Sequence, residues 1–250
     1  MKTQNYLFIT LFFFFLVNVC NGQEVIGKVI YNATVEETKE YKEKYKSQNN
    51  SQDKLFKAIE KEGEKFNLEL VFSNQNSVYQ LIDPMRKGSE NQYAYKMAKI
   101  IYKAGNKFYY SVKDKTITKE VDFLEKNYLI ETKNDSSNWT MLNKQEKIGE
   151  YVCYLAEREY EYMSRKGKTK VKQTVWYTPE LAFPFGPANF VGLPGLVLKV
   201  KSGTIVYNAK QIKIKPKEKI KLENITKGKR ISQSEFNKIA KKARENLIKR

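Results

Sequence analysis

The chain has 250 residues and a formal net charge of +18, with no histidine and two cysteines. The missing histidine excludes a Ser-His-Asp triad, a Cys-His pair and any histidine-ligated zinc or haem site. Two cysteines, Cys20 and Cys153, are too few for a thiolate metal cluster. We therefore expect neither a metal site nor a cofactor.

The N-terminus resembles an export signal. Lys2 precedes a phenylalanine-rich apolar run over residues 7–19, and small or polar residues follow it. We expect cleavage after Gly22, which makes residues 1–22 a signal peptide and residues 23–250 a single β-rich domain in the periplasm or at the cell surface. Lipidation at Cys20 is the alternative, although Val19 is bulky where lipoprotein signals prefer a small residue.

The first third of the mature chain mixes strands with a helical insert. A β-branched strand is expected over 24–36, followed by a lysine-rich insert over 39–65 that has the spacing of one or two amphipathic helices. Strands are expected again at 67–73 and 77–82. Residues 83–99 are polar, and we expect no regular element there.

The middle of the chain is dense in short strands separated by Gly, Asn and Asp, and the end is helical. Ser232 and Glu235 form a capping-box pattern, so an amphipathic helix is expected over 232–250, packed on the sheet or lying on a membrane surface. The fold class expected is mainly β: a curved antiparallel sheet or open half-barrel with a helical insert and a C-terminal helix. The further strands expected are 107–112, 116–123, 128–132, 139–142, 151–163, 171–178, 196–200 and 204–214.

A row of carboxylates stands out on the strand at 151–163. Glu157, Glu159 and Glu161 alternate along it and share one face, opposite Lys170 and Lys172 of the next strand. This pattern predicts a solvated face with cross-strand ion pairs. The alternative is a carboxylate hydrolase that uses Glu157, Glu159 or Asp122, which would require two carboxyl groups facing each other across a cleft.

Glycine and proline crowd into residues 179–195, which hold four of the six prolines and three of the twelve glycines. Leu193-Pro194-Gly195-Leu196 has type II turn chemistry, with proline at the second position and a glycine at positive φ at the third. Gly192 adds a place for close backbone approach. Residues 181–198 contain no Ser, Thr, Asp, Glu or Lys, so they provide no acid, base or nucleophile. The apolar residues of this segment either line a hydrophobic ligand groove or fill the core. They are Phe183, Phe185, Phe190, Leu193 and Pro194.

This segment resembles the signature of the GLPGLI family, secreted proteins typical of Bacteroidota. The residues that carry the resemblance are Gly186, Pro187, Phe190, Gly192, Leu193, Pro194, Gly195 and Leu196, with Val197 where the family has isoleucine. Similarity extends upstream through residues 148–156 and Trp176-Tyr177-Thr178. The resemblance implies an uncharacterised envelope protein in the setting of outer-membrane receptor systems, with no catalytic residues to carry over.

We therefore expect a non-enzymatic protein that binds an apolar ligand or a partner; an accessory protein of an outer-membrane complex is the alternative. The lysines are spread over the whole chain without a nucleic-acid-binding module, so no nucleic-acid partner is expected. The charge is expected to reflect a lysine-rich composition on a solvated surface; the alternative is peripheral contact with an anionic envelope surface. Cys153 is expected to be a buried small apolar residue.

Overall fold

The computed structural model describes residues 27–36, 50–82, 91–135, 138–164, 167–215, 222, 225 and 227–248. The expected signal peptide, Cys20 and the first part of the lysine-rich insert lie outside these residues. None of the helices in the described part of the chain is both long and apolar enough to cross a membrane.

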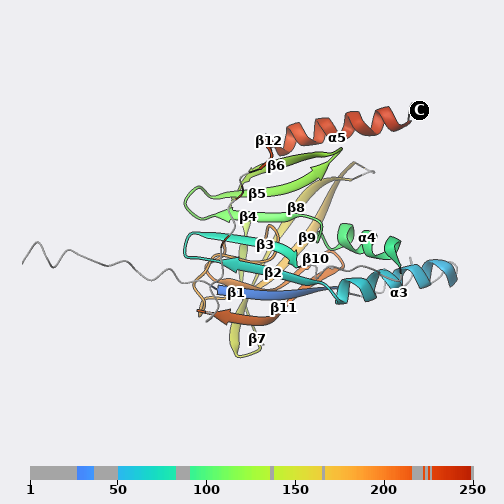
Figure 1. The fold of residues 1–250 in the computed structure, drawn as a ribbon. Helices are drawn as coiled ribbons and strands as arrows, with labels where there is room; N and C mark the ends of the chain where they lie inside the picture. Colours follow the sequence, from blue (N-terminus) through green and yellow to red (C-terminus); the bar gives the residue numbers. More distant parts are fainter. Residues whose placement is uncertain are drawn as a thin grey trace, which may run out of the picture.

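Twelve strands and three helices make up the described chain (Figure 1). The strands are β1 Gly27–Val35, β2 Asn67–Phe72, β3 Asn76–Ile82, β4 Lys107–Ser111, β5 Thr116–Phe123, β6 Lys126–Lys133, β7 Thr140–Ile148, β8 Tyr151–Ser164, β9 Gly167–Thr178, β10 Leu196–Ser202, β11 Ile205–Ile214 and β12 Lys229–Ser232; the helices are α3 Asn50–Glu64, α4 Gln92–Ile101 and α5 Gln233–Ile248.

All twelve strands belong to one sheet in the order β12-β6-β5-β4-β3-β2-β1-β11-β10-β9-β8-β7. Neighbours are antiparallel except for β12, which runs parallel to β6. The sheet is open, because β12 and β7 lie at its two ends and are not paired with each other. The prediction of a mainly β protein on a single antiparallel sheet is therefore confirmed.

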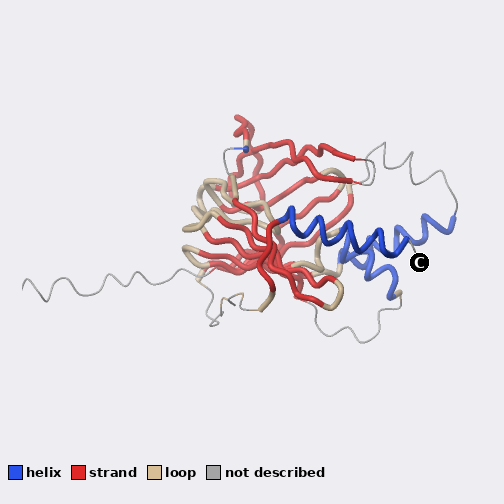
Figure 2. Tube along the Cα trace, turned by 90° about the horizontal axis from the view of Figure 1, so that it is seen from above, coloured by secondary structure: helices blue, strands red, loops and turns tan. Residues whose placement is uncertain are grey.

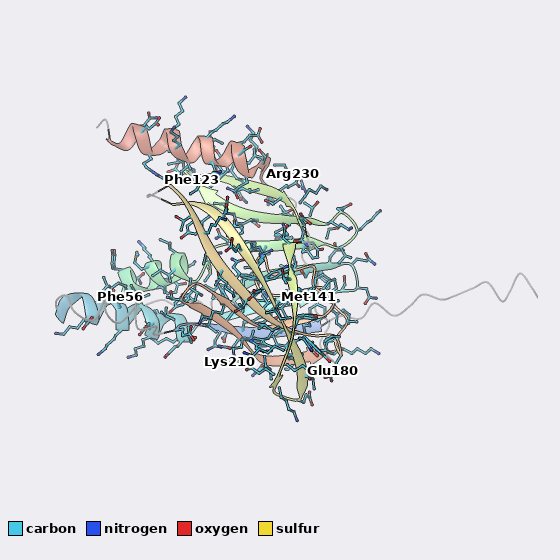
Figure 3. The ribbon with its side chains drawn as sticks, turned by 180° about the vertical axis from the view of Figure 1, so that it is seen from behind. Phe56, Phe123, Met141, Glu180, Lys210 and Arg230 are labelled. Carbon is cyan, nitrogen blue, oxygen red and sulfur yellow. The ribbon has the colours of Figure 1, made fainter. Side chains whose placement is uncertain are left out.

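The sheet is strongly bent. The register shifts after Ile30, between Met141 and Gln145, and between Val197 and Lys199, and such bulges bend a strand and increase its twist. The long hairpin of β8 and β9 consequently crosses in front of the remaining strands when seen from behind (Figure 3). Figure 2 shows the same curl from above. The concave face of the sheet holds both the core and the site described below.

One apolar core fills much of this concave face. Tyr31, Phe72, Tyr79 and Tyr207 come from the central strands and are almost fully buried. Helices α3 and α4 pack against each other beside one end of these strands (Figure 1). The rings of Phe66 and Tyr102 meet edge to face at that junction, 6.3 Å apart.

Helix α5 begins at the expected cap. The hydroxyl oxygen of Ser232 accepts a hydrogen bond from the backbone N–H of Glu235 at 3.2 Å, and the Glu235 carboxylate accepts one from the N–H of Ser232 at 2.7 Å. The Phe236 ring packs against Phe123 and Tyr128, with ring centroids 5.5 Å and 5.9 Å apart. The helix lies along the β12 end of the sheet (Figure 1).

Two elements differ from the expectation. Residues 92–101 form α4 where a polar excursion without regular structure was expected; Asn91 caps this helix, accepting a hydrogen bond from the N–H of Ala94 at 2.9 Å. Ala94, Ala98 and Tyr102 then repeat at helical spacing and are fully buried, a pattern that many lysine and tyrosine neighbours obscure. Strand β12 was not expected because it has only four residues.

Candidate functional site

A cleft lies on the concave face between β4–β6 on one side and β8–β9 on the other. It consists of two cavities of about 340 Å³ and about 710 Å³ that share four lining residues: Lys103, Lys119, Tyr160 and Gln233. We call this the basic cleft. The remaining walls come from strand side chains, from loop residues that include Asn189 of the glycine- and proline-rich segment, and from helix α5.

Arg158 is the central cation of the cleft. It projects from β8, and its guanidinium carbon lies 4.2 Å from the centroid of the Trp139 ring and 5.7 Å from that of Phe190. Its Nε donates a hydrogen bond to the side-chain oxygen of Gln173 at 2.8 Å. Its Nη2 is buried and has no hydrogen-bond partner among the described residues. The aromatic rings and Gln173 hold the guanidinium in place, and its Nη2 is left without a hydrogen-bond partner in the described part of the chain while it is shielded from solvent.

Two lysines face Arg158 across the cleft. Lys119 projects from β5, with its ammonium 5.9 Å from the centroid of the Phe236 ring. Lys103 follows helix α4 and has a φ of +52°, which is uncommon for a residue with a side chain. Five other non-glycine residues of the described chain also have a positive φ, so this conformation belongs to the turn that ends α4. The turn brings Lys103 to the cleft wall.

Burial and mutual repulsion disfavour the charged forms of the three cations. Burial lowers the pKa of Lys103, and the charges of Lys119 and Arg158 lower it further. Burial also lowers the pKa of Lys119, and it lowers that of Arg158 to about 10. Within the described part of the chain, no carboxylate forms an ion pair with any of these three cations.

Acidic side chains do border the cleft. Glu159 and Asp135 lie on the first cavity, and Glu161 lies on the second. Glu159 and Glu161 are both paired with Lys170, at 3.3 Å and 3.6 Å. Their charge is therefore compensated outside the cleft, and the cleft keeps a positive excess.

The carboxylate row confirms the expected solvated face. Glu157 pairs with Lys172 at 2.7 Å, in addition to the two ion pairs of Lys170, so both lysines lie across from the row as expected. Asp122 is exposed near the end of β5 and lines neither cavity of the basic cleft. These carboxyl groups thus pair with lysines or lie in solvent, and they do not face one another across a cleft.

The apolar residues of the glycine- and proline-rich segment lie mainly in the core. Phe185, Phe190 and Leu193 are almost fully buried, Phe183 is half-buried and Pro194 is exposed. The Phe72 ring packs on Phe183 and Phe185, with centroids 4.8 Å and 5.4 Å apart. None of the five lines either cavity of the basic cleft, and their role in a ligand groove stays a prediction.

The type II turn expected at Leu193–Leu196 is wrong, and the two glycines exchange their expected roles. Gly192 has a φ of +86°, whereas Gly195 is not in the left-handed region. The Gly195 N–H donates to the Leu193 carbonyl at 2.8 Å, which makes a tighter, three-residue turn centred on Pro194. A Cβ on Gly195 would lie 2.2 Å from the Thr178 carbonyl oxygen, so close backbone approach is what requires glycine here.

The other motif residues also shape the backbone or fill the core. A Cβ on Gly186 would lie 2.3 Å from the Phe190 carbonyl oxygen. The Pro187 carbonyl accepts a hydrogen bond from the Phe190 N–H at 3.0 Å, and Leu196 begins β10 fully buried. The motif therefore folds the segment compactly against the ends of β9 and β10.

Cys153 is fully buried on β8, as expected. Burial raises the pKa of its thiol to about 11, with a smaller contribution from the nearby charge of Glu146. The thiol is therefore protonated at neutral pH, which does not suit a nucleophile.

The cations of the basic cleft were not selected from the sequence. Arg158 alternates with Ala156 and Tyr160 along its strand, and Lys119 lies in the same way between Ile117 and Val121. A cation on an otherwise apolar strand face is the signal that could have found both. No such signal marks Lys103, whose position depends on the turn after α4.

Comparisons with known proteins support the fold and leave the function open. Residues 139–199 match the sequence profile of a family described as a protein of unknown function, Porph_ging. No curated protein matches the chain. The chain is similar in fold to PNGF-II in its P21 crystal form, with a TM-score of 0.50 and 13% identity over 85% of this chain and 32% of that chain. The C2 crystal form of PNGF-II gives a TM-score of 0.49 and 15% identity over 86% of this chain. The chain therefore spans about a third of the length of those structures.

Proposed function

We propose that this protein is a non-enzymatic binding protein that holds an anionic ligand in the basic cleft. The observation that carries the proposal is the convergence of Lys103, Lys119 and Arg158 on one cleft without an acidic partner among the described residues. All three cations are partly buried, and a charge that is partly removed from water is stabilised by an ionic partner. A bound anion would provide the missing partner.

This ligand differs from the apolar one that the phenylalanines of residues 183–190 suggested. Phe185 and Phe190 are packed within the core, whereas the cleft wall combines cations, amides and tyrosines. Pockets that use a few charged groups to orient a ligand are typical of binding sites. Export, and contact with an anionic envelope surface or an outer-membrane receptor complex, remain proposals that rest on the sequence.

Titration calorimetry with phytate tests the charge of the cleft directly. Phytate carries many phosphate groups on one ring and serves as a probe for anion binding. Lys119→Gln removes one cation from the cleft, and Lys210→Gln removes an exposed lysine of β11 (labelled in Figure 3), which gives the same change in net charge.

We expect Lys119→Gln to weaken phytate binding about tenfold, the effect of losing one charge-assisted hydrogen bond. Lys210→Gln should leave the affinity within about twofold, because an exposed charge far from the ligand is screened by salt. Equal weakening in the two variants would show that net charge alone attracts the probe, and it would refute binding in the cleft. No binding to the unaltered chain at low ionic strength would refute the proposal as well.

A further inference from the structure

Beyond its cations, the basic cleft displays two tyrosines that are unusually exposed for their size. Tyr160 and Tyr162 line the second cavity, and their side chains are 40% and 45% exposed. They follow Arg158 at every second residue of β8, so the three side chains lie in a row on one face of the strand, about 7 Å apart. The guanidinium carbon of Arg158 is 5.9 Å from the centroid of the Tyr160 ring. The row thus combines one cation with two accessible aromatic faces.

The first cavity adds three side-chain amides without a hydrogen-bond partner among the described residues. They belong to Asn106, Asn138 and Asn189, and each comes from a different part of the chain. An amide both donates and accepts, so it can bind a hydroxyl group in either direction. These amides place hydrogen-bonding groups at several points of the cavity wall beside Arg158.

This combination matches the chemistry of an acidic sugar chain. The C–H faces of sugar rings stack on aromatic side chains, hydroxyl groups pair with amides, and carboxylates pair with lysine and arginine. A strand of nucleic acid would use the cations and tyrosines in a similar way, and its base edges could also pair with the amides, so oligothymidylate is included among the probes below. A simple phosphate would leave both tyrosines and amides unused.

We infer that the basic cleft binds an acidic oligosaccharide whose carboxylates lie against Lys103, Lys119 and Arg158 and whose rings stack on Tyr160 and Tyr162. The inference rests on the proposed function and specifies its ligand class. The two exposed rings lie about 7 Å apart along β8, so they can contact a chain of more than one sugar.

Calorimetric titration with tetragalacturonate, the uncharged tetramer of galactose and phytate tests this assignment. We expect tetragalacturonate to bind and the uncharged tetramer to bind at least tenfold more weakly, since it lacks the carboxylates. Tyr160→Ser and Tyr162→Ser should each weaken tetragalacturonate binding by roughly five- to tenfold and leave phytate binding unchanged. Tyr93→Ser is the matched control, because Tyr93 is 60% exposed on α4 and lines neither cavity of the cleft.

These titrations distinguish a failure of the sugar assignment from a failure of the proposed anion-binding function. If phytate binds through Lys119 but tetragalacturonate does not bind, or binds equally in the tyrosine variants, the sugar assignment is refuted and the anion site stands. If single-stranded oligothymidylate binds more tightly than tetragalacturonate and depends on the same tyrosines, the ligand is a nucleic acid and the assignment is refuted. If none of the anions binds, the proposed function itself fails.

Discussion

The exchange of roles between Gly192 and Gly195 gives a sharp test of how the glycine- and proline-rich segment is built. A Cβ on Gly195 would lie 2.2 Å from the Thr178 carbonyl oxygen and 2.6 Å from its carbonyl carbon. Both are backbone atoms at the end of β9, and Thr178 is paired with Leu196, so this backbone has little freedom to move away. Gly195→Ala should therefore lower the free energy of unfolding by about 1–3 kcal/mol through overpacking.

Gly192→Ala should cost about 1–2 kcal/mol for a different reason, because alanine disfavours the φ of +86° found there. Asparagine separates the two mechanisms, since it tolerates positive φ but is larger than alanine. We expect Asn to be less damaging than Ala at position 192 and more damaging than Ala at position 195.

Urea unfolding of the four variants, followed by circular dichroism, measures these differences. The reasoning would be refuted if Gly195→Asn were more stable than Gly195→Ala. That result would place the positive φ at Gly195, as a type II turn requires.

Three further predictions concern single side chains. Lys119→Met should raise the urea midpoint at pH 7, because it removes a partly buried cation that lies near two others. The pKa of Lys119 is lowered in the fold, so the unaltered chain gains stability as pH rises through that pKa. The difference in midpoint between the two chains should therefore narrow toward alkaline pH. A lower midpoint for Lys119→Met at pH 7 would contradict the unfavourable electrostatics of the cleft. Ser232→Ala should lower stability by about 1 kcal/mol and reduce the helical circular dichroism signal of α5. Lys242→Ala is the control, because Lys242 is exposed on α5 and lies far along the helix from the cap, and it should change neither. Iodoacetamide at pH 8 should modify Cys153 in urea but not in the folded chain, because the thiol is buried. The folded pKa of this thiol is raised to about 11, so the unfolded chain ionises first and stability should fall as pH rises above about 9. Rapid alkylation of Cys153 in the folded chain, mapped by mass spectrometry, would count against the burial of this side chain.

The sequence predicted the sheet well because strand periodicity is a local property. The eleven expected strands correspond to β1–β11, and the ion pairs of Lys170 and Lys172 follow from alternation and a hairpin register. Helix α4 was missed because its buried positions are two alanines and a tyrosine, which have little apolar bulk in a lysine-rich context.

The site could not be found in the same way, because it forms between strands that are far apart in the sequence. Lys119 and Arg158 lie on separate hairpins and meet only because the sheet bends. The glycine- and proline-rich segment attracted attention through composition, yet its side chains mainly fill the core. A local pattern showed that Gly192 and Gly195 matter but not which of them has the positive φ, since that depends on contact with Thr178.

Lysine acetylation footprinting with and without phytate shows whether an anion binds in the basic cleft, beside Lys103 and Lys119. Acetylation of each lysine is followed by mass spectrometry at limiting reagent, so the protein stays folded and every lysine reports its own accessibility. The account predicts that phytate protects Lys103 and Lys119 from acetylation and leaves the exposed Lys210 as reactive as before. Equal protection of all three lysines, or protection of Lys210 alone, would contradict an anion site in the basic cleft.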